Sequence, residues 1–357
     1  METWVLKLKD WFIEYSRPMP WRDNPNAYNT WISEIMLQQT QVATVIPYFE
    51  RFIKKFPNVR ALAESEIDPI LKQWEGLGYY SRARNLHKAA KVICDNYKEI
   101  IPNDYSEIQK IPGIGPYTGA AIISIAYSTP VSVVDGNVLR VFTRFWGIYE
   151  DIKLPKIRDI LFHKLNAYVK LIEPPIFNQA IMEIGALICT PKEPKCTQCP
   201  LQNDCFAKQT KNQDQLPVKS KSKPVPTHTI VVGIIKHKNK YLIAKRKEDQ
   251  MLGGLWEFPG GKVKSKETLE NALLREIKEE VNLDVTIEQK LGTIKHAYSH
   301  FKIVLHAFIC SSTTNKAKAN TSDKVEWINL DQLNDFAFPT ANKKLFKLIN
   351  KSPLFIS

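Results

Sequence analysis

The chain has 357 residues, which is more than one typical compact domain holds and suggests two domains. Apolar residues make up 44% of it, enough to bury real cores, and this argues against bulk disorder. The net charge of +13 points to a polyanionic partner, either nucleic acid or an anionic membrane surface, although charge alone does not separate this from a soluble protein that is merely basic.

The N-terminal segment and the cysteines indicate the compartment. Charges are scattered through the segment METWVLKLKDWFIEYSRP, so it is not a secretory signal, and no apolar run approaches the length of a membrane span. Six cysteines in a chain this long do not make a disulfide scaffold; four of them cluster, and Cys94 and Cys310 stand alone. We therefore expect a metal centre in a reducing cytosol and no membrane association.

The first two-thirds of the chain have the pattern of helices. Apolar residues recur at helical spacing over 122–126 and 138–145, and proline and glycine separate such segments. The stretch from Leu216 to Thr229 is rich in proline, lysine and serine and has almost nothing to bury, which is typical of an interdomain linker.

After this stretch the pattern becomes that of strands. Residues 229–235 and 241–244 are predicted to form a hairpin, a long helix follows over 268–281, and two strand-like runs flank 296–300. We expect an all-α domain followed by an α+β domain. The predicted boundaries are a helical domain over 1–214, a linker over 215–227 and a second domain over 228–357.

Glu34 is the first candidate for chemistry. It shares a helical stripe with Trp31 and Ile35 after a predicted cap at Asn29 or Thr30. A carboxyl group on a core-facing stripe is poorly solvated, so its pKa should rise toward that of a general acid. The alternative is a helix glutamate that points to water, and this segment alone favours that alternative.

The segment IPGIGPYTGAA, residues 111–121, predicts a phosphate-binding hairpin. Gly113 and Gly115 let the backbone approach an anion closely, and Pro116 suits the first position of the following helix. With its flanking helical segments it resembles the helix-hairpin-helix of base-excision glycosylases, and this resemblance implies binding to DNA phosphates without reading of sequence. A turn without function is the alternative, because a pattern of two glycines is short.

Asp135 follows a β-branched run and precedes a helix, which is the place of an N-cap. There it should stay ionised, because backbone N–H groups and the helix dipole favour the charged form. Most aspartates at such positions are only caps. An ionised aspartate opposite a protonated glutamate is, however, the pair that glycosidic cleavage needs.

Cys189, Cys196, Cys199 and Cys205 form a C-x6-C-x2-C-x5-C pattern. Four thiolates in one loop can hold zinc or an iron–sulfur cluster. Zinc sites usually show two close pairs, whereas here one pair lies between two single cysteines. The spacing resembles the [4Fe–4S] loop of the endonuclease III superfamily of DNA glycosylases, and this resemblance implies a cluster. Its expected role is to hold a loop carrying Lys192 and Lys195 against DNA.

These motifs resemble the catalytic part of adenine DNA glycosylases, the MutY family of the endonuclease III superfamily. The resemblance covers residues 1 to about 210 and rests on PMPWR, WISEIMLQQTQV, WEGLGYYSRARNL, IPGIGPYTGAA, VVDGNV and the spacing of the cysteine loop. It implies a helix-hairpin-helix fold with a [4Fe–4S] cluster. The substrate cleft would lie between a six-helix part over about 25–130 and a cluster part made of 1–24 and 131–214.

The resemblance also implies roles for single residues. Glu34 would protonate N7 of adenine and later activate water, and Asp135 would stabilise the oxocarbenium ion or bind the sugar covalently. Tyr117 and Asn137 would orient and support Asp135. Endonuclease III enzymes carry a Schiff-base lysine at the position of Tyr117, so removal of the base with little or no strand cleavage is expected here.

Other positions would contact the DNA. By the same resemblance, Gln39, Leu77 and Tyr79 would wedge into the duplex around the flipped base. Arg22 and Gln179 would lie near the adenine pocket.

The second domain contains a segment that looks like a Nudix box: Gly261, five residues, Glu267, seven residues, then REIKEE. In Nudix hydrolases these glutamates bind Mg²⁺, which here would involve Glu276, Glu279 and Glu280. Adenine glycosylases typically carry a decayed box, but here only its final glycine is replaced, by Asn282. The alternative is a solvated Glu/Lys helix face.

Residues 296–300 resemble the loop with which the family reads 8-oxoguanine. Tyr298 stands where phenylalanine is common, Ser299 can donate and accept hydrogen bonds, and His300 could add a contact. The alternative is a polar hairpin turn that has no role in recognition.

We therefore predict a monomeric, monofunctional DNA glycosylase in the bacterial cytoplasm that removes adenine opposite 8-oxoguanine or guanine in duplex DNA. Three rivals remain at this stage. They are a bifunctional glycosylase/lyase, a Nudix nucleotide pyrophosphatase fused to a DNA-binding helical module, and a non-enzymatic iron–sulfur DNA-binding protein.

Overall fold

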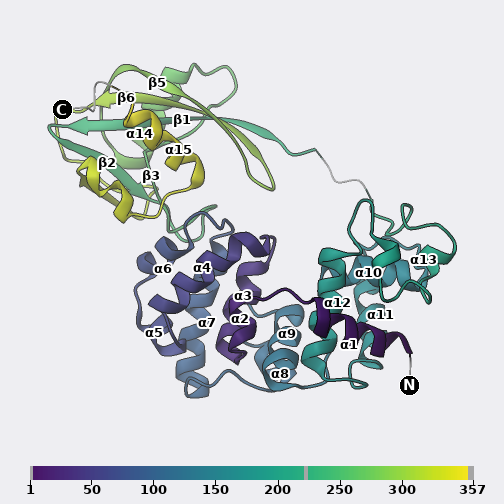
Figure 1. Cartoon of the computed structure of the whole chain (residues 1–357). Coiled ribbons are helices and arrows are strands. Elements are labelled where there is room, and N and C mark those ends of the chain that lie inside the picture. The colour runs from purple at the N-terminus through teal and green to yellow at the C-terminus, as the bar shows by residue number, and fades with distance from the viewer. Residues whose placement is uncertain (1–2, 221–223, 353–357) are drawn as a thin grey trace. The chain divides into compact units, whose positions relative to one another are not determined.

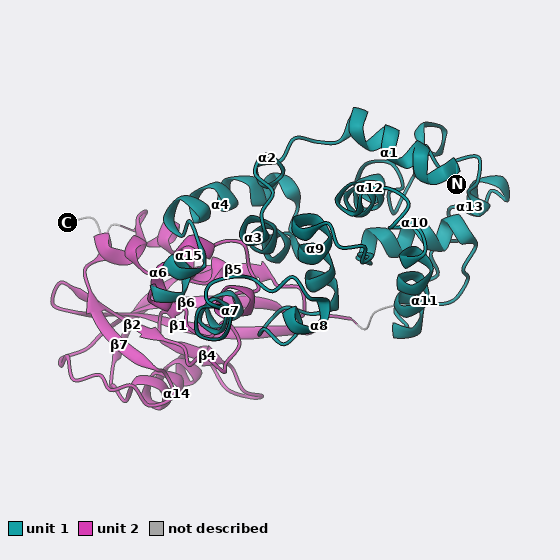
Figure 2. Ribbon diagram, turned by 90° about the horizontal axis from the view of Figure 1, so that it is seen from below, with its two compact units in different colours: residues 1–64, 85–222 teal, residues 65–84, 223–357 magenta. Residues whose placement is uncertain are grey.

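A computed structural model describes residues 3–220 and 224–352 (Figure 1). The chain divides into two compact units, which Figure 2 distinguishes by colour. Unit 1 comprises residues 1–64 and 85–222, and unit 2 comprises residues 65–84 and 223–357. Within the described ranges, no helix has both the length and the apolar character that crossing a bilayer requires.

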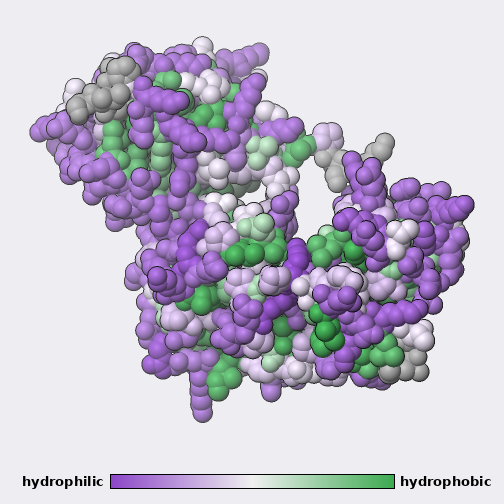
Figure 3. All heavy atoms as spheres, viewed as in Figure 1, coloured by the Kyte–Doolittle hydropathy of each residue, from purple (hydrophilic) through white to green (hydrophobic). Residues whose placement is uncertain are grey.

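Unit 1 is helical, as the spacing of its apolar residues predicts. Its elements are α1 (Thr3–Tyr15), α2 (Pro20–Asp23), α3 (Ala27–Leu37), α4 (Val42–Lys55), α5 (Val59–Glu64), the larger part of α7 (Ser81–Tyr97), α8 (Tyr105–Ile108), α9 (Pro116–Tyr127), α10 (Gly136–Trp146), α11 (Pro155–Asn166), α12 (Pro174–Leu187), the 3₁₀ turn η1 (Cys196–Gln198) and α13 (Phe206–Gln209). Hydrophilic side chains cover most of the face that Figure 3 shows.

The N-terminal helix of unit 1 packs against helices that come much later in the chain. Trp4 and Leu8 of α1 are buried in one core with Phe142 of α10 and Phe177 of α12. Helix α12 also packs against α9, which in turn packs against α3. These successive helix–helix contacts bring residues of α3, α9 and α10 close together.

The predicted hairpin is formed by α8, a tight turn and α9. Gly113 has φ +79°, a left-handed conformation that favours glycine, and Gly115 is the N-cap of α9. Pro116 occupies the first turn of the helix, as predicted. Both glycines are exposed, so their backbone N–H groups are accessible to an anion.

Unit 2 contains a mixed sheet. Its elements are α6 (Ile67–Trp74), β1 (Thr227–His237), β2 (Lys240–Lys245), β3 (Trp256–Glu257), β4 (Gly260–Lys262), α14 (Leu269–Val281), β5 (Thr286–Ala297), β6 (Lys302–Ser311), β7 (Lys324–Ile328), η2 (Leu330–Asp335) and α15 (Thr340–Ile349). The strand order is β3-β2-β1-β6-β5, with β4 also paired to β1 and β7 to β2. Strands β1 and β6 are parallel, and the other pairs are antiparallel.

The two faces of this sheet are buried by different helices. Along β1, Val231 and Ile235 pack in the core that includes α14, whereas Val232 and Ile234 pack in the core that includes α15. This alternation follows from the two-residue period of a strand. The α+β class predicted for the second domain is thereby confirmed.

Residues 65–84 group with the C-terminal residues, which differs from the predicted boundary at residue 214. The physical reason is a set of polar contacts to the segment before α15. Lys72 Nζ donates to the carbonyl of Phe336 at 2.9 Å, and Glu75 accepts from the N–H of Phe338 at 2.9 Å and from Lys343 Nζ at 2.8 Å.

The first residues of the expected linker pack on unit 1. Leu216 is buried, and its carbonyl accepts a 2.7 Å hydrogen bond from Arg144 Nε. The N–H of Ile152 donates to the carbonyl of Val218 at 3.1 Å. An apolar side chain and two satisfied carbonyls hold this part of the segment in place, despite its linker-like composition.

Candidate active site

Glu34 lies on the buried face of α3. The N-cap of this helix is Asn26, whose side chain accepts from the N–H of Asn29, so the predicted cap at Asn29 or Thr30 was wrong by one turn. Glu34 is 6% exposed. Burial raises its pKa to about 7, because the charged form loses its hydration. Near neutral pH this carboxyl group can therefore still carry a proton, as a general acid must.

Tyr117, in the first turn of α9, contacts Glu34 directly. Its hydroxyl donates to Oε2 of Glu34 at 2.6 Å and also lies 3.7 Å from the sulfur of Met182. The expected support of Asp135 by Tyr117 is therefore not what the hydrogen bonds show, because the phenol is bonded to the other carboxyl group. Since it stabilises the carboxylate, this hydrogen bond opposes the rise in the pKa of Glu34.

Asp135 is the N-cap of α10, as its sequence position predicts. Its Oδ1 accepts from the N–H of Val138 at 2.7 Å, and its Oδ2 accepts from Asn137 Nδ2 at 2.8 Å. Burial nevertheless raises the pKa of Asp135, against the lowering effect of these hydrogen bonds. The cap hydrogen bonds, on which the prediction of an ionised Asp135 was based, are therefore present, but burial opposes their effect on its pKa.

A cavity of about 930 Å³ lies in unit 1 between α3, α9, α10 and α12. It brings together several predicted residues, namely Glu34, Tyr117, Asp135, Asn137, Arg22 and Gln179. Arg22 Nε donates to Oε1 of Gln179 at 2.8 Å. Sequence reasoning missed Glu183, a buried carboxylate that pairs with Arg17 at 2.7 Å and with Arg22 at 3.2 Å. Its position four residues after Gln179, on the same helix face, was the available signal.

The predicted wedge residues differ in their exposure. Gln39 is exposed and Tyr79 is half-buried, and both have left-handed backbones, with φ +57° and φ +48°. Such conformations are strained for residues with a side chain and are often found at functional sites. Leu77, by contrast, is buried. Its role as a wedge stays a prediction.

The predicted lesion-reading loop lies between β5 and β6 and shares a hollow of about 370 Å³ in unit 2 with Tyr79. The hydroxyl of Tyr79 hydrogen-bonds Oγ of Ser299, and its ring lies 6.3 Å from that of His300 in an edge-to-face arrangement. Tyr298 stacks on Phe301, with ring centroids 4.7 Å apart. Ser299 and His300 are exposed, so their polar atoms are accessible to a ligand.

The four clustered cysteines of unit 1 line one small hollow and form no disulfide. In the described part of the chain no three Cys, His, Asp or Glu side chains converge on one point, so the thiols surround this hollow without closing on a centre. Burial raises the pKa of Cys199 to about 12, which keeps this thiol protonated unless a metal replaces the proton.

Arg144 supplies an independent test of whether this hollow suits a cluster. It is 2% exposed and donates to the sulfur of Cys189 at 3.3 Å and to the carbonyl of Thr190 at 2.7 Å. Its other hydrogen bonds go to the carbonyl oxygens of Leu216 at 2.7 Å and Pro191 at 3.3 Å, and none of these partners is a carboxylate. A buried cation of this kind needs an anion, and a thiolate-ligated cluster would supply one. The donor set and its surroundings therefore fit an iron–sulfur cluster.

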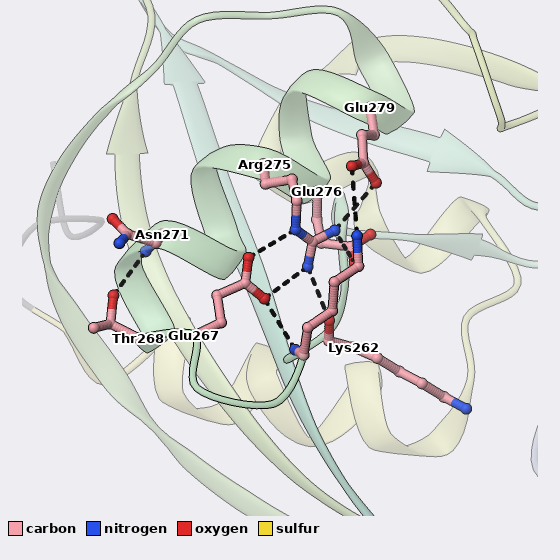
Figure 4. Close-up of polar contacts among 8 residues, drawn as sticks. Lys262, Glu267, Thr268, Asn271, Arg275, Glu276 and Glu279 are labelled. Carbon is pink, nitrogen blue, oxygen red and sulfur yellow. Dashed lines mark hydrogen bonds and ion pairs between the residues drawn. The ribbon is translucent and has the colours of Figure 1, made fainter.

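The glutamates of the Nudix box are arranged around Arg275 (Figure 4). This guanidinium donates to Glu267 at 2.7 Å, to Glu276 at 2.7 Å and to Glu279 at 3.1 Å. Glu280 is buried and accepts from the N–H of Gly260 at 2.9 Å. Among the described side chains no group of three ligands that could hold a metal ion is found there, so the structure gives no support for the predicted Mg²⁺ site.

Comparisons with known proteins agree with both units. Residues 32–165 match the model of HhH-GPD superfamily base excision DNA repair proteins, and residues 230–348 match that of the NUDIX domain. The adenine DNA glycosylase of Buchnera aphidicola subsp. Schizaphis graminum (strain Sg) is 35% identical over 95% of this chain and 96% of its own. The chain belongs to the adenine DNA glycosylase family.

Other members and neighbours of the adenine DNA glycosylase family support this assignment. The human adenine DNA glycosylase is 30% identical over 96% of this chain and 73% of its own. A solved thermostable thymine-DNA glycosylase matches 58% of this chain and 96% of its own, with 26% identity and a TM-score of 0.54. Family membership makes the protein an enzyme of base excision repair that hydrolyses an N-glycosyl bond.

Proposed function

We propose that the protein removes adenine that is paired with 8-oxoguanine or guanine in duplex DNA. The observation that carries this proposal is the buried Glu34, bonded to Tyr117 inside a cavity that Asp135 also lines. Glu34 would donate its proton to the leaving base, and Asp135 would stabilise the positive charge that develops on the sugar. Because the glycosidic bond cannot be reached inside the base stack, the adenine would be flipped out of the duplex into this cavity.

We further propose that the enzyme is monofunctional. Strand cleavage by a lyase requires an amine that forms an imine with the sugar. Tyr117 provides a phenol instead, and no lysine is found among the described residues that line the cavity. Hydrolysis of the glycosidic bond would therefore leave an intact strand with an abasic site.

The hollow of unit 2 supports recognition of the base opposite adenine. Ser299 offers a hydroxyl that can donate or accept, and Tyr79 and His300 place aromatic surfaces beside it. An altered purine edge is read through such hydrogen bonds, and the aromatic surfaces suit stacking on a base. We assign the discrimination between 8-oxoguanine and guanine to this hollow.

A [4Fe–4S] cluster held by Cys189, Cys196, Cys199 and Cys205 completes the proposal. It would hold in place the loop that carries the exposed cations Lys192 and Lys195, which suit DNA phosphates. We expect a monomer acting in the cytoplasm, because the residues for base removal and for lesion reading are on one chain.

Cleavage of labelled duplexes under single-turnover conditions tests the function. The duplex holds adenine opposite 8-oxoguanine or guanine, and samples are quenched with and without hot alkali. We expect strand breaks only after alkali and more of them opposite 8-oxoguanine. A duplex with adenine opposite thymine is the matched control, since it offers the same base without the mispair.

The other outcomes separate the rival functions. Breaks without alkali would mean that some amine acts as a lyase. Absence of breaks in every lane would contradict the proposal and favour nucleotide hydrolysis at the Nudix box, which magnesium-dependent release of phosphate or pyrophosphate from free nucleotides would then reveal.

A further inference from the structure

Thr30 lies one helical turn before Glu34 on α3, and both side chains line the cavity of unit 1. Thr30 is 3% exposed. Its backbone is fully engaged: its N–H donates to the carbonyl of Asn26 at 2.9 Å, and its carbonyl accepts from Oγ of Ser33 at 3.0 Å. The backbone is thereby held one turn from the general acid, whereas the side chain can still rotate about χ1.

Thr30 and Ser132 are the two buried residues of unit 1 whose hydroxyls lack a hydrogen-bond partner among the described residues, and only Thr30 lines the cavity. Thr30 Oγ1 is buried and makes no hydrogen bond to any residue that the structure describes, so a rotation about χ1, which threonine allows in a helix, is needed to turn it into the cavity. By contrast, Thr143 is fully buried in α10, and its hydroxyl donates to the carbonyl of Leu139 at 2.7 Å. Nearly all buried polar groups have a hydrogen-bond partner in the protein. A group without one has lost its hydrogen bonds to water on folding and gained none in return, which destabilises the folded state.

A hydroxyl without a hydrogen-bond partner in a binding cavity is explained if a bound ligand supplies that partner. The same cavity holds Glu34, which our proposed function places against the adenine base. A purine edge carries both hydrogen-bond donors and acceptors, and a hydroxyl can match either. Because Thr30 lies one turn from Glu34, both side chains can reach one flat base.

We propose that Thr30 binds the polar edge of the extruded base and is a further substrate-binding residue of the enzyme. The inference rests on the proposed excision of adenine and deepens it. It assigns to the threonine hydroxyl a role in holding the flipped base in the position where Glu34 can protonate it. A hydroxyl kept for this purpose lowers the stability of the free protein and is satisfied only in the complex.

Substitution of the hydroxyl by a methyl group tests this directly. Thr30→Val keeps the shape of the side chain and removes only the hydrogen-bonding atom, and Thr30→Ser keeps the hydroxyl. We expect Thr30→Val to lower the single-turnover rate of adenine release by about threefold to tenfold, and Thr30→Ser to retain most of it. We also expect Thr30→Val to raise the melting temperature by about 1–3 °C, because it removes an unsatisfied polar group.

Thr143→Val is the matched control, since it removes a buried threonine hydroxyl that has a partner within the protein. It should lower the melting temperature and leave the excision rate unchanged. The inference is overturned if Thr30→Val excises adenine as fast as the wild type, or if it loses stability as Thr143→Val does. If the wild-type protein itself releases no adenine, the proposed function fails and this inference fails with it.

Discussion

The phenolic hydroxyl of Tyr117 donates to Oε2 of Glu34 at 2.6 Å, and this hydrogen bond lowers the pKa of Glu34 against the larger effect of burial. Tyr117→Phe removes a hydrogen bond to the carboxylate and should raise the pKa of Glu34 further. We expect the basic limb of the pH–rate profile to move to higher pH. An unchanged profile would show that Glu34 is not the group that titrates in the reaction.

Substitution of Glu34 should separate catalysis from stability. Glu34→Gln removes the proton donor, and excision should fall by about a hundredfold or more. The folded-state pKa of Glu34, about 7, lies above the unfolded value of 4.5. Its contribution to stability is therefore fully present below pH 4.5 and is lost as the pH rises through about 7.

The size of this effect can be measured by urea unfolding at pH 5 and pH 8. A shift of this size corresponds to about 3 kcal/mol between the protonation states. The wild type should lose up to that much stability relative to Glu34→Gln on going to pH 8. Parallel losses in the two proteins would contradict the assignment of a raised pKa to Glu34.

Asp135→Asn tests the second carboxyl group without removing the cap. Asparagine is as good an N-cap as aspartate, so the melting temperature should stay close to that of the wild type. The negative charge that would stabilise the sugar cation is lost, and the single-turnover rate should fall by at least about a hundredfold. Near-native turnover in this variant would refute the two-carboxylate mechanism.

Ser299→Ala tests lesion reading in unit 2. The variant loses the hydroxyl that Tyr79 contacts, and the preference for 8-oxoguanine over guanine should fall by about threefold to tenfold. The ratio of single-turnover rates on the two mispairs measures it. Ser265→Ala is the control, because Ser265 is exposed in the same unit and does not line the hollow. A preference that survives Ser299→Ala would exclude this hydroxyl from recognition.

Iron analysis tests the cysteine hollow. Protein purified without oxygen should contain about four iron atoms and four sulfides per chain and absorb broadly in the visible range. Cys199→Ser should lose most of the iron, whereas Cys94→Ser should keep it, because Cys94 lies outside the hollow. Zinc in place of iron would restore the alternative that the cysteine spacing left open.

The sequence was enough to predict those features that depend on interactions between residues close together in the chain. Helical and strand periodicity identified the class of each domain, because burial of one face imposes a period on the chain. The capping role of Asp135 and the glycines of the hairpin were also predicted, since neighbouring residues alone produce a helix N-terminus or a left-handed turn.

Only the tertiary structure decided what depends on residues distant in sequence. The partner of Tyr117 turned out to be Glu34 rather than Asp135, because the packing of α9 against α3 sets that distance. The pKa of Asp135 is raised because the folded protein buries it, and the residues next to it in sequence do not predict that burial. Tyr79 and Ser299, far apart in the chain, meet because buried carboxylate contacts of Glu75 hold residues 65–84 on unit 2.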